Sequence, residues 1–316
     1  MQSLAIDAEC ESPLGFLPVA TTDSVLPQAA LALPQPHPAV ALMARETIVR
    51  EGSVAREIAG EAVADDRWML RGEEFLFRTI EGIGLHYRRG DGITLDCPAG
   101  IDQRTIALWL NGTLYAAIAA INGLFPFHAS AVEHRGRVHA FTGTAGAGKS
   151  TLVAALGRTG FAQFCDDTLI LDISGDGPPV CLPGHKRLKL WPEGVALAGV
   201  EPGELVAHDY RKHFVEPVAG TIAEPLPLAE LVFLERGDEP LVAPLGGAER
   251  IGRLQDDHYT AELWRQANYQ QRTERFATLA ALARRIAMQR FVRPFEPARF
   301  AEGIDHIAAH IRKATA

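Results

Sequence analysis

The chain has 316 residues, of which 47% are hydrophobic and 22% are charged. These proportions indicate a globular protein with enough apolar side chains for one large domain or two smaller ones. The formal net charge of −8 argues against non-specific binding to nucleic acid, which needs many Lys and Arg side chains to neutralise phosphates. Nucleic acid is therefore not expected as a partner.

Cysteine spacing and the N-terminal composition bear on location. No pair of the four cysteines has the CxxC spacing of a zinc or redox site, so we expect free thiols in a reducing cytoplasm. The first Lys or Arg is Arg45, so the charged segment typical of a secretory signal peptide is not expected. The longest apolar stretch, residues 114–127, contains Asn122, Gly123 and Pro126 and is too short to span a bilayer. These features predict a cytoplasmic location and no membrane partner.

Two regions precede the glycine-rich part of the chain. Residues 1–44 contain six prolines and no Lys or Arg, which predicts an extended or poorly ordered arm, or one packed on the surface of the domain. Residues 45–122 are predicted to form a small β-rich domain with a buried helix. In this region, strands at 84–87 and 93–96 flank a turn, and residues 103–122 are apolar nearly all round.

Residues 123–316 are predicted to form an α/β domain of the P-loop kinase type. A β-hairpin is expected from 129–133 and 137–142, and a strand at 161–165. Towards the end of the chain, apolar residues recur at helical spacing over 276–286 and again over 300–311. These two segments predict amphipathic helices that pack on the core.

The most specific motif is a phosphate-binding loop. An apolar strand at 138–142 runs into a segment that fits GxxxxGK[ST] in full, and a helix follows. Glycines let the backbone wrap around phosphates, while exposed N–H groups at the helix start attract anions. The residues predicted to hold a nucleotide are Gly143, Thr144, Ala145, Gly146, Ala147, Gly148, Lys149, Ser150 and Thr151. Lys149 would reach the β- and γ-phosphates, and Ser150 would offer its hydroxyl to Mg²⁺.

Two adjacent carboxylates, Asp166 and Asp167, follow the strand after the P-loop helix. In a parallel α/β sheet, functional groups collect at the carboxyl ends of strands, which is where the phosphates should lie. Phosphoryl transfer to a hydroxyl needs a carboxylate near the metal and a group that orients or accepts the hydroxyl proton. Two neighbouring Asp side chains could divide these tasks. A turn or helix cap is the alternative interpretation of the pair.

A basic segment, residues 183–191, is a further candidate. Arg187 and Lys189, and more weakly Lys212, could hold the transferring phosphoryl group or an anionic end of the substrate. The alternative is a solvated strand face, because basic residues alternate with Leu188 and Leu190. The sequence leaves both interpretations open.

The segment 127–132, the P-loop and Phe164-Cys165-Asp166-Asp167 together resemble, in order and spacing, the catalytic domain of HPr kinase/phosphorylase. That family phosphorylates a seryl hydroxyl of a carrier protein with ATP or pyrophosphate and Mg²⁺. The resemblance implies that His128 belongs to the site, that Asp166 is the general base and that Asp167 helps to hold the metal. Because the family is hexameric, the resemblance is also compatible with a homo-oligomer.

The chain departs from that family in two places. The downstream signature resembling Glu-Ile-Arg-Gly is missing, and residues 183–191 stand in its place. The N-terminal region also resembles a different, smaller β domain. Both features are similar to shorter HPr-kinase-like proteins, among them lasso peptide kinases, which phosphorylate the C-terminal Ser of a precursor peptide.

The resulting hypothesis is an ATP- and Mg²⁺-dependent serine kinase that acts on a peptide. The alternatives are a kinase for an HPr-type protein or a small molecule, and a nucleotide-sensing module with little transfer. The chain contains no NKxD element and no LSGGQ-like segment, so a GTPase or a transporter ATPase is not favoured. The sequence does not decide between ATP, GTP and pyrophosphate as the donor.

Overall fold

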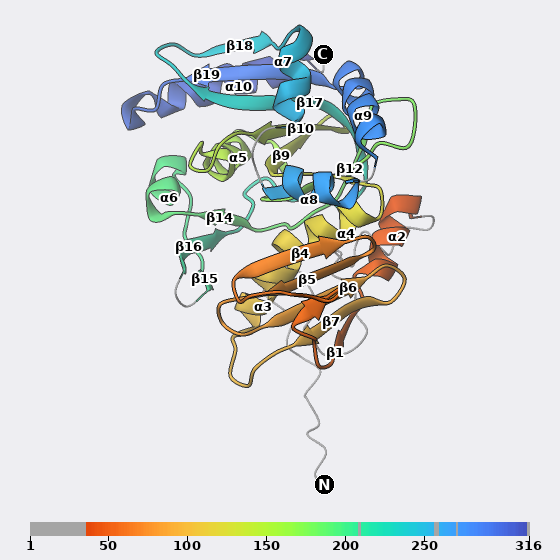
Figure 1. Ribbon diagram of the computed structural model, residues 1–316. Helices are drawn as coiled ribbons and strands as arrows, with labels where there is room; N and C mark the ends of the chain where they lie inside the picture. Colours follow the sequence, from red (N-terminus) through yellow and green to blue (C-terminus); the bar gives the residue numbers. More distant parts are fainter. Residues whose placement is uncertain (1–35, 208–209, 256–258, 270, 315–316) are drawn as a thin grey trace.

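The computed structural model describes residues 36–207, 210–255, 259–269 and 271–314. It is a mixed α/β structure in which a smaller N-terminal sheet lies against a larger C-terminal α/β part (Figure 1). The helices are α2 (Pro38–Glu46), α3 (Gln103–Trp109), η1 (Leu110–Leu114), α4 (Tyr115–Ile121), α5 (Lys149–Arg158), α6 (Pro192–Ala198), α7 (Gly247–Leu254), α8 (Tyr259–Ala267), α9 (Arg272–Arg285), η2 (Pro297–Arg299) and α10 (Phe300–Ala314).

The N-terminal sheet has the strand order β1-β7-β6-β5-β4. Its strands are β1 (Val49–Glu51), β4 (Arg67–Arg71), β5 (Glu74–Arg78), β6 (Gly84–Arg88) and β7 (Gly92–Asp96), with β2 (Glu57–Ile58) and β3 (Glu61–Ala62) forming a separate ribbon. Strands β6 and β7 form the expected hairpin. Gly92 has a φ of 82° and a Cβ there would lie 2.8 Å from the Ile48 carbonyl oxygen, so only glycine fits this turn.

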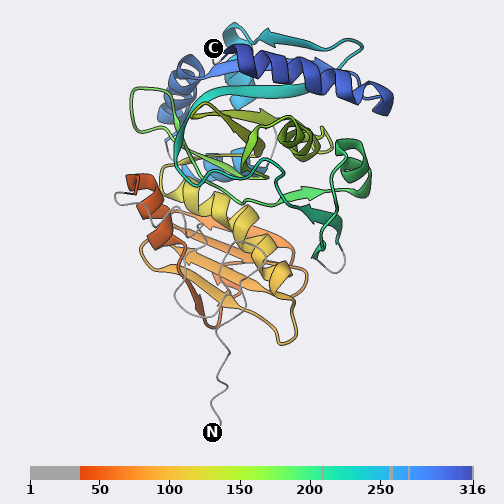
Figure 2. The same ribbon diagram turned by 180° about the vertical axis from the view of Figure 1, so that it is seen from behind.

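Helices α3 and α4 cross the face of this sheet, as Figure 2 shows from behind. Asp102 caps α3 by accepting a hydrogen bond from the Arg104 N–H at 2.9 Å. The π-helical turn η1 joins α3 to α4 at Gly112, whose backbone leaves the helical region. All seven residues of α4 are buried, because the helix packs between the N-terminal sheet and α8. The predicted helical run at 103–122 is present, but its burial is complete only in α4, since Ile106 is the one buried residue of α3.

Of the described residues, one helical run, Gln103–Ile121, is long and apolar enough to cross a membrane, with a mean hydropathy of 1.2. Most of its apolar window is buried inside the fold, which is what the core helix of a globular domain requires.

The central sheet of the C-terminal part has the strand order β11-β9-β10-β17-β13-β12-β8, with β19 paired to β17 and β18 to β19. Its strands are β8 (Phe125–Phe127), β9 (Ala129–His134), β10 (Arg137–Thr142), β11 (Ala162–Cys165), β12 (Leu169–Asp172), β13 (Val180–Leu182), β17 (Leu226–Arg236), β18 (Leu241–Pro244) and β19 (Ala287–Arg293). Strands β9 and β10 form the expected hairpin around Arg135 and Gly136, both with positive φ.

The direction of these strands brings distant segments together. Strand β9 is antiparallel to both β10 and β11, so β10 and β11 run the same way. Strands β17 and β19 are parallel to β10. The sheet is therefore mixed rather than the parallel sheet assumed from the sequence, since the tight hairpin inserts β9 between two parallel strands. The carboxyl ends of β10 and β11 and the start of β9 share one edge.

A separate sheet of three strands, β14 (Leu188–Leu190), β16 (Tyr210–Val215) and β15 (Leu205–Ala207), lies beside α5 and α6. Strand β15 also contacts α3 of the N-terminal part. This small sheet therefore touches both halves of the molecule.

Two sequence-based expectations need correction. Residues 1–35 of the expected N-terminal arm lie outside the described residues, but residues 38–46 of the chain form helix α2, with Pro38 at its first position and buried Val40 and Met43 on one face. In α9 the side chain of Phe276 is 59% exposed, so it does not share the buried face of Leu279 and Leu282. Helix α10 buries Phe300, Ile304, Ile307 and Ile311, as predicted.

Because Leu114 is fully buried beneath the N-terminal sheet, Leu114→Ala should lower the free energy of unfolding by about 2–5 kcal/mol. The matched control is Leu241→Ala, since Leu241 is 52% exposed and should cost much less. Urea denaturation measures both. Equal costs for the two variants would contradict the central packing position of this helical segment.

Candidate functional site

The phosphate-binding loop lies between the end of β10 and the start of α5. Gly148 is the N-cap of α5 and has a φ of 82°, in the left-handed region. A Cβ at Gly148 would lie 2.7 Å from Nη2 of Arg293, so this position admits only glycine. The strand–loop–helix context that the motif requires is present.

Lys149 is the first residue of α5 and is buried. Its Nζ donates to the carbonyl oxygens of Gly143 at 3.0 Å and Thr144 at 3.4 Å, so the side chain folds back over its own loop. Burial lowers the pKa of Lys149, while Asp166 and Asp167 act to raise it. The ammonium group thus contacts the loop, and the two carboxylates favour its charged form.

Asp166 is 2% exposed and accepts three hydrogen bonds. Its Oδ1 accepts from the hydroxyls of Ser130 at 2.6 Å and Ser150 at 2.8 Å, and its Oδ2 accepts from the Lys189 N–H at 2.9 Å. Asp166, rather than Asp167, is therefore the carboxylate that contacts the P-loop serine. The family resemblance instead implied that Asp167 joins Ser150 in holding the metal.

Asp167 is more open, with 29% of its side chain exposed. Its Oδ2 lies 2.6 Å from Lys189 Nζ, and its Oδ1 lies 3.2 Å from His128 Nδ1. Burial acts to raise the pKa of Asp167, but Lys189 and His128 together hold it well below the usual range. Asp167 is therefore ionised, and its backbone φ of 72° is an uncommon conformation for a residue other than glycine.

The proton on His128 can be assigned from its partners. Nδ1 lies 2.8 Å from the Asp167 carbonyl oxygen as well as near the Asp167 carboxylate. Both partners are acceptors, so Nδ1 must carry the hydrogen. His128 thus binds Asp167 through main chain and side chain, which supports the expectation that His128 belongs to the site.

Residues from four strands meet here, and the strand directions in the central sheet bring three of these strands together. Thr142 ends β10, Asp166 follows β11, and Ser130 lies near the start of the antiparallel β9. Thr142 Oγ1 donates to the His128 carbonyl oxygen at 3.0 Å, which joins β10 to the residue before β9. Lys189 comes from β14, in the separate three-stranded sheet.

The three basic candidates have different positions. Lys189 lies at the carboxylates and is 9% exposed. Lys212 lies over the rings of Trp191 and Tyr210, at 5.6 and 5.5 Å. Arg187 is 7% exposed and stacks on Phe214 at 4.1 Å. The solvated strand face considered from the sequence is wrong for Arg187 and Lys189, because both side chains are buried and paired.

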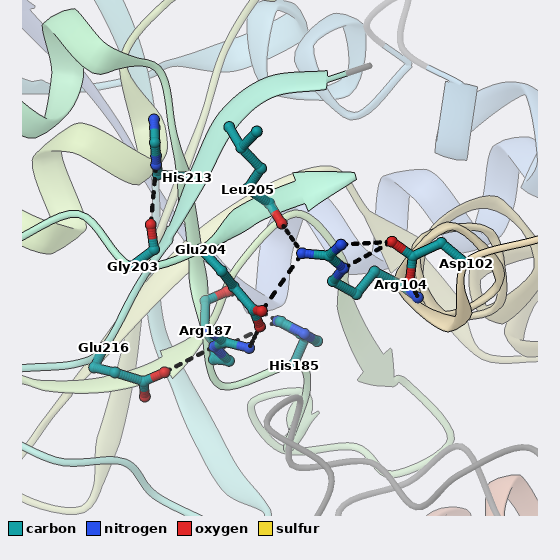
Figure 3. Close-up of polar contacts among 9 residues, drawn as sticks. All are labelled: Asp102, Arg104, His185, Arg187, Gly203, Glu204, Leu205, His213 and Glu216. Carbon is teal, nitrogen blue, oxygen red and sulfur yellow. Dashed lines mark hydrogen bonds and ion pairs between the residues drawn. The ribbon is translucent and has the colours of Figure 1, made fainter. Parts of the chain in front are cut away.

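Figure 3 shows the surroundings of Arg187. Its guanidinium pairs with Glu204 at 3.1 Å and Glu216 at 2.7 Å. Arg104, from the start of α3, also reaches Glu204, at 3.5 Å, and the Leu205 carbonyl oxygen, at 3.4 Å. The partners of Arg187 in these ion pairs thus come from residues beside β15 and β16. Arg187 immediately precedes β14, so its ion pair with Glu204 links β14 to β15. Arg104 extends this link to the N-terminal part.

Two further residues at the site were not singled out from the sequence, although Ser130 lies within the segment 127–132 that carries the family resemblance. The ring of Tyr259 lies 5.5 Å from that of His128, and its hydroxyl lies 3.1 Å from Thr168 Oγ1. Ser130 is fully buried against Asp166. Tyr259 begins α8, far along the chain, and belongs to no recognised motif, so only the tertiary structure places it here.

The residues present fit a hard cation that also binds substrate phosphates. Ser150 Oγ and Asp166 Oδ1 are oxygen donors 2.8 Å apart at the start of the P-loop helix. Within the described parts of the chain, three or more His, Cys, Asp or Glu side chains nowhere group in a way that could hold a metal. Mg²⁺ does not need such a cage, because it is usually bound by one or two protein oxygens together with phosphates and water.

Comparison with models of protein families and with curated proteins finds no match. Among solved structures, the HPr(Ser) kinase/phosphatase from Coxiella burnetii is similar at 11% sequence identity and a TM-score of 0.31. That likeness covers 60% of this chain and 99% of the other. At this level of similarity, the chemistry of the site has to be inferred from the residues of this chain.

Lys189→Met should raise the pKa of Asp167 towards the usual value of about 3.9, because His128 alone would then oppose the effect of burial. Carboxyl-carbon NMR titration measures this pKa, and Lys212→Met is the control. A carboxylate whose pKa is lower in the folded than in the unfolded protein stabilises the fold at pH values above its unfolded-state pKa. This contribution is lost as the pH falls through the pKa of the folded state. The stability difference between Lys189→Met and wild type should therefore narrow below about pH 4. An Asp167 pKa that is the same in Lys189→Met as in Lys212→Met would contradict this account.

Proposed function

We propose that the chain is a nucleotide-dependent phosphotransferase that moves a phosphoryl group from ATP to a hydroxyl, with Mg²⁺ as its metal. The observation that carries this proposal is the division between the two carboxylates. Asp166 is buried and accepts a hydrogen bond from Ser150 of the P-loop, whereas its neighbour Asp167 is partly exposed and paired with Lys189 and His128. A site that only binds a nucleotide would need Asp166 beside Ser150 but not Asp167 in this arrangement.

The loop amides and Lys149 would bind the phosphates. The start of α5 carries unpaired N–H groups and the positive end of the helix dipole, which favour anions. Lys149 now donates to carbonyls of its own loop, and these bonds would be exchanged for bonds to phosphate oxygens.

Ser150 and Asp166 would hold the metal. Mg²⁺ would neutralise charge on the phosphates as the phosphoryl group leaves. The three hydrogen bonds to Asp166 fix its carboxylate before any ligand arrives, and fixed groups need little reorganisation during reaction.

Asp167 would orient the acceptor hydroxyl and receive its proton, so the roles are the reverse of those that the family resemblance implied. Its low pKa keeps it ionised and able to accept a hydrogen bond from the hydroxyl. Phosphoryl transfer demands little proton abstraction before the transition state, so a weak base in the right position suffices. Lys189, bound to Asp167 at 2.6 Å, would offset negative charge that develops between acceptor and phosphate.

The proposed acceptor is a seryl hydroxyl of a peptide, such as the C-terminal Ser of a lasso peptide precursor. The resemblance over 127–132, the P-loop and 164–167 is the basis for this choice. An HPr-type protein or a small molecule is the alternative acceptor. A nucleotide-sensing module would explain the P-loop but gives no reason for the ordered, ionised Asp167. Self-association and a cytoplasmic location stay predictions.

Intact mass spectrometry of a precursor peptide ending in Ser, incubated with the protein, ATP and Mg²⁺, tests the proposal. We expect a gain of one or more phosphate masses, and we expect Lys149→Ala to abolish it because the phosphates lose their main side-chain cation. Peptides in which the terminal Ser is replaced by Ala serve as controls. ATP binding without any mass gain, on this peptide or on an HPr-type protein, would favour the sensor alternative.

The two aspartates should differ in kinetic effect. Asp167→Asn is expected to lower kcat by about 10²–10⁴-fold with little change in the affinity for Mg²⁺ and nucleotide, because it removes the acceptor of the hydroxyl proton and leaves Ser150 and Asp166 in place. Asp166→Asn should instead weaken the Mg²⁺-dependent part of nucleotide binding by about 10–100-fold. Calorimetry with and without Mg²⁺, combined with steady-state kinetics, separates the two. If Asp166→Asn mainly lowered kcat and Asp167→Asn mainly weakened Mg²⁺-dependent nucleotide binding, the assignment that the resemblance implied would be supported instead.

A further inference from the structure

Arg293, at the end of β19, lies directly behind the phosphate-binding loop. It is 5% exposed, and its Nη2 donates to the Ala147 carbonyl oxygen at 2.8 Å. Its guanidinium lies 4.9 Å from the ring centre of Phe295 and 5.8 Å from that of Phe300. Its Nε is buried and has no hydrogen-bond partner among the described residues.

Among the residues that the structure describes, no carboxylate compensates the charge of Arg293. Among the described residues, the nearest carboxylates all lie beyond ion-pair distance of its guanidinium, whereas most other buried basic groups, such as Arg187 and Lys189, have such partners. Burial lowers the pKa of Arg293 to about 10, and Arg236 acts in the same direction. The group is still cationic at neutral pH, and a buried cation without a counter-charge is costly.

The contact with Ala147 also orients the loop. In a trans peptide the C=O and N–H groups point in opposite directions. Because the Ala147 carbonyl points at Arg293, the N–H of Gly148 points away from it, towards the opposite side of the loop. Successive N–H groups that face one side of a loop form a concave site for anions.

We propose that Arg293 is a positioning residue for the phosphates of the nucleotide. It holds the peptide between Ala147 and Gly148 with the N–H turned to the ligand, and it adds positive charge from behind the loop. The counter-charge that the described residues do not provide is then supplied by the ligand, a compound with a diphosphate or triphosphate group. This inference rests on the proposed nucleotide binding.

A purely structural role of Arg293 would have a different effect on stability and phosphate affinity. If Arg293 served only to pack between aromatic rings, its loss would lower stability and leave phosphate affinity alone. Arg236 provides a matched control, because its guanidinium also stacks on Phe295, at 3.9 Å, and no contact of Arg236 with the loop is found in the described structure. Both arginines can be replaced by Met, which keeps an unbranched apolar side chain.

The experiment is calorimetric titration of wild type, Arg293→Met and Arg236→Met with ADP, inorganic pyrophosphate and adenosine, together with thermal unfolding of the ligand-free proteins. For Arg293→Met we expect Kd for ADP and for pyrophosphate to rise about tenfold or more, as for the loss of a charged hydrogen-bonding group. Adenosine, which lacks phosphate, should show no such change. The ligand-free Tm of Arg293→Met should stay close to that of wild type, because loss of the hydrogen bond to Ala147 is offset by removal of a buried charge that has no ion-pair partner among the described residues.

Equal Kd values for ADP in Arg293→Met and Arg236→Met would overturn the inference. If Arg293→Met does not fold, Arg293→Lys decides, because it keeps the charge but loses the planar guanidinium. A measurable loss of pyrophosphate affinity in Arg293→Lys supports the inference, and wild-type affinity overturns it. If the wild-type protein binds neither ADP nor pyrophosphate, the proposed function fails as well, which is distinguishable from failure of the inference alone.

Discussion

Lys189 binds both carboxylates of the site with two different groups. Its main-chain N–H donates to Asp166 and its ammonium pairs with Asp167, at 2.9 and 2.6 Å. The two aspartates are adjacent in sequence, yet one is buried on Ser150 and the other is partly exposed beside His128. The ammonium group of this one residue therefore helps to keep Asp167 ionised, while its main chain fixes the orientation of Asp166, so that the two carboxylates can take distinct roles.

The arrangement of the two aspartates depends on the placement of the strand that carries Lys189. Strand β14, which carries Lys189, is only three residues long and pairs with β16 alone. Arg187, just before β14, is tied to Glu204 and Glu216, and Arg104 of the N-terminal part also reaches Glu204 (Figure 3). The N-terminal part thus supports the strand that completes the site, while the central sheet supplies the P-loop, Asp166 and Ser130.

The sequence predicted those parts of the site that are local. The P-loop is contiguous, and the strand, glycines, lysine and helix each follow from residues within a short window. The Asp pair and the hairpin of β9 and β10 were likewise found from local pattern. Which aspartate contacts Ser150 could not be predicted, because it depends on the backbone conformation at Asp167, where φ is 72°. Lys189 was left undecided since its burial depends on the pairing of β14 with β16. Tyr259 and Arg293 are brought to the site only by tertiary packing.

The most direct measurement of the central claim is a crystal structure with ADP and Mn²⁺ in place of Mg²⁺, in which anomalous scattering locates the metal. The account predicts that the metal contacts Ser150 Oγ on the side of Asp166, with Asp167 still paired to Lys189 and facing the open side of the site. A metal bound directly to the Asp167 carboxylate, with Asp166 remote from it, would contradict the account.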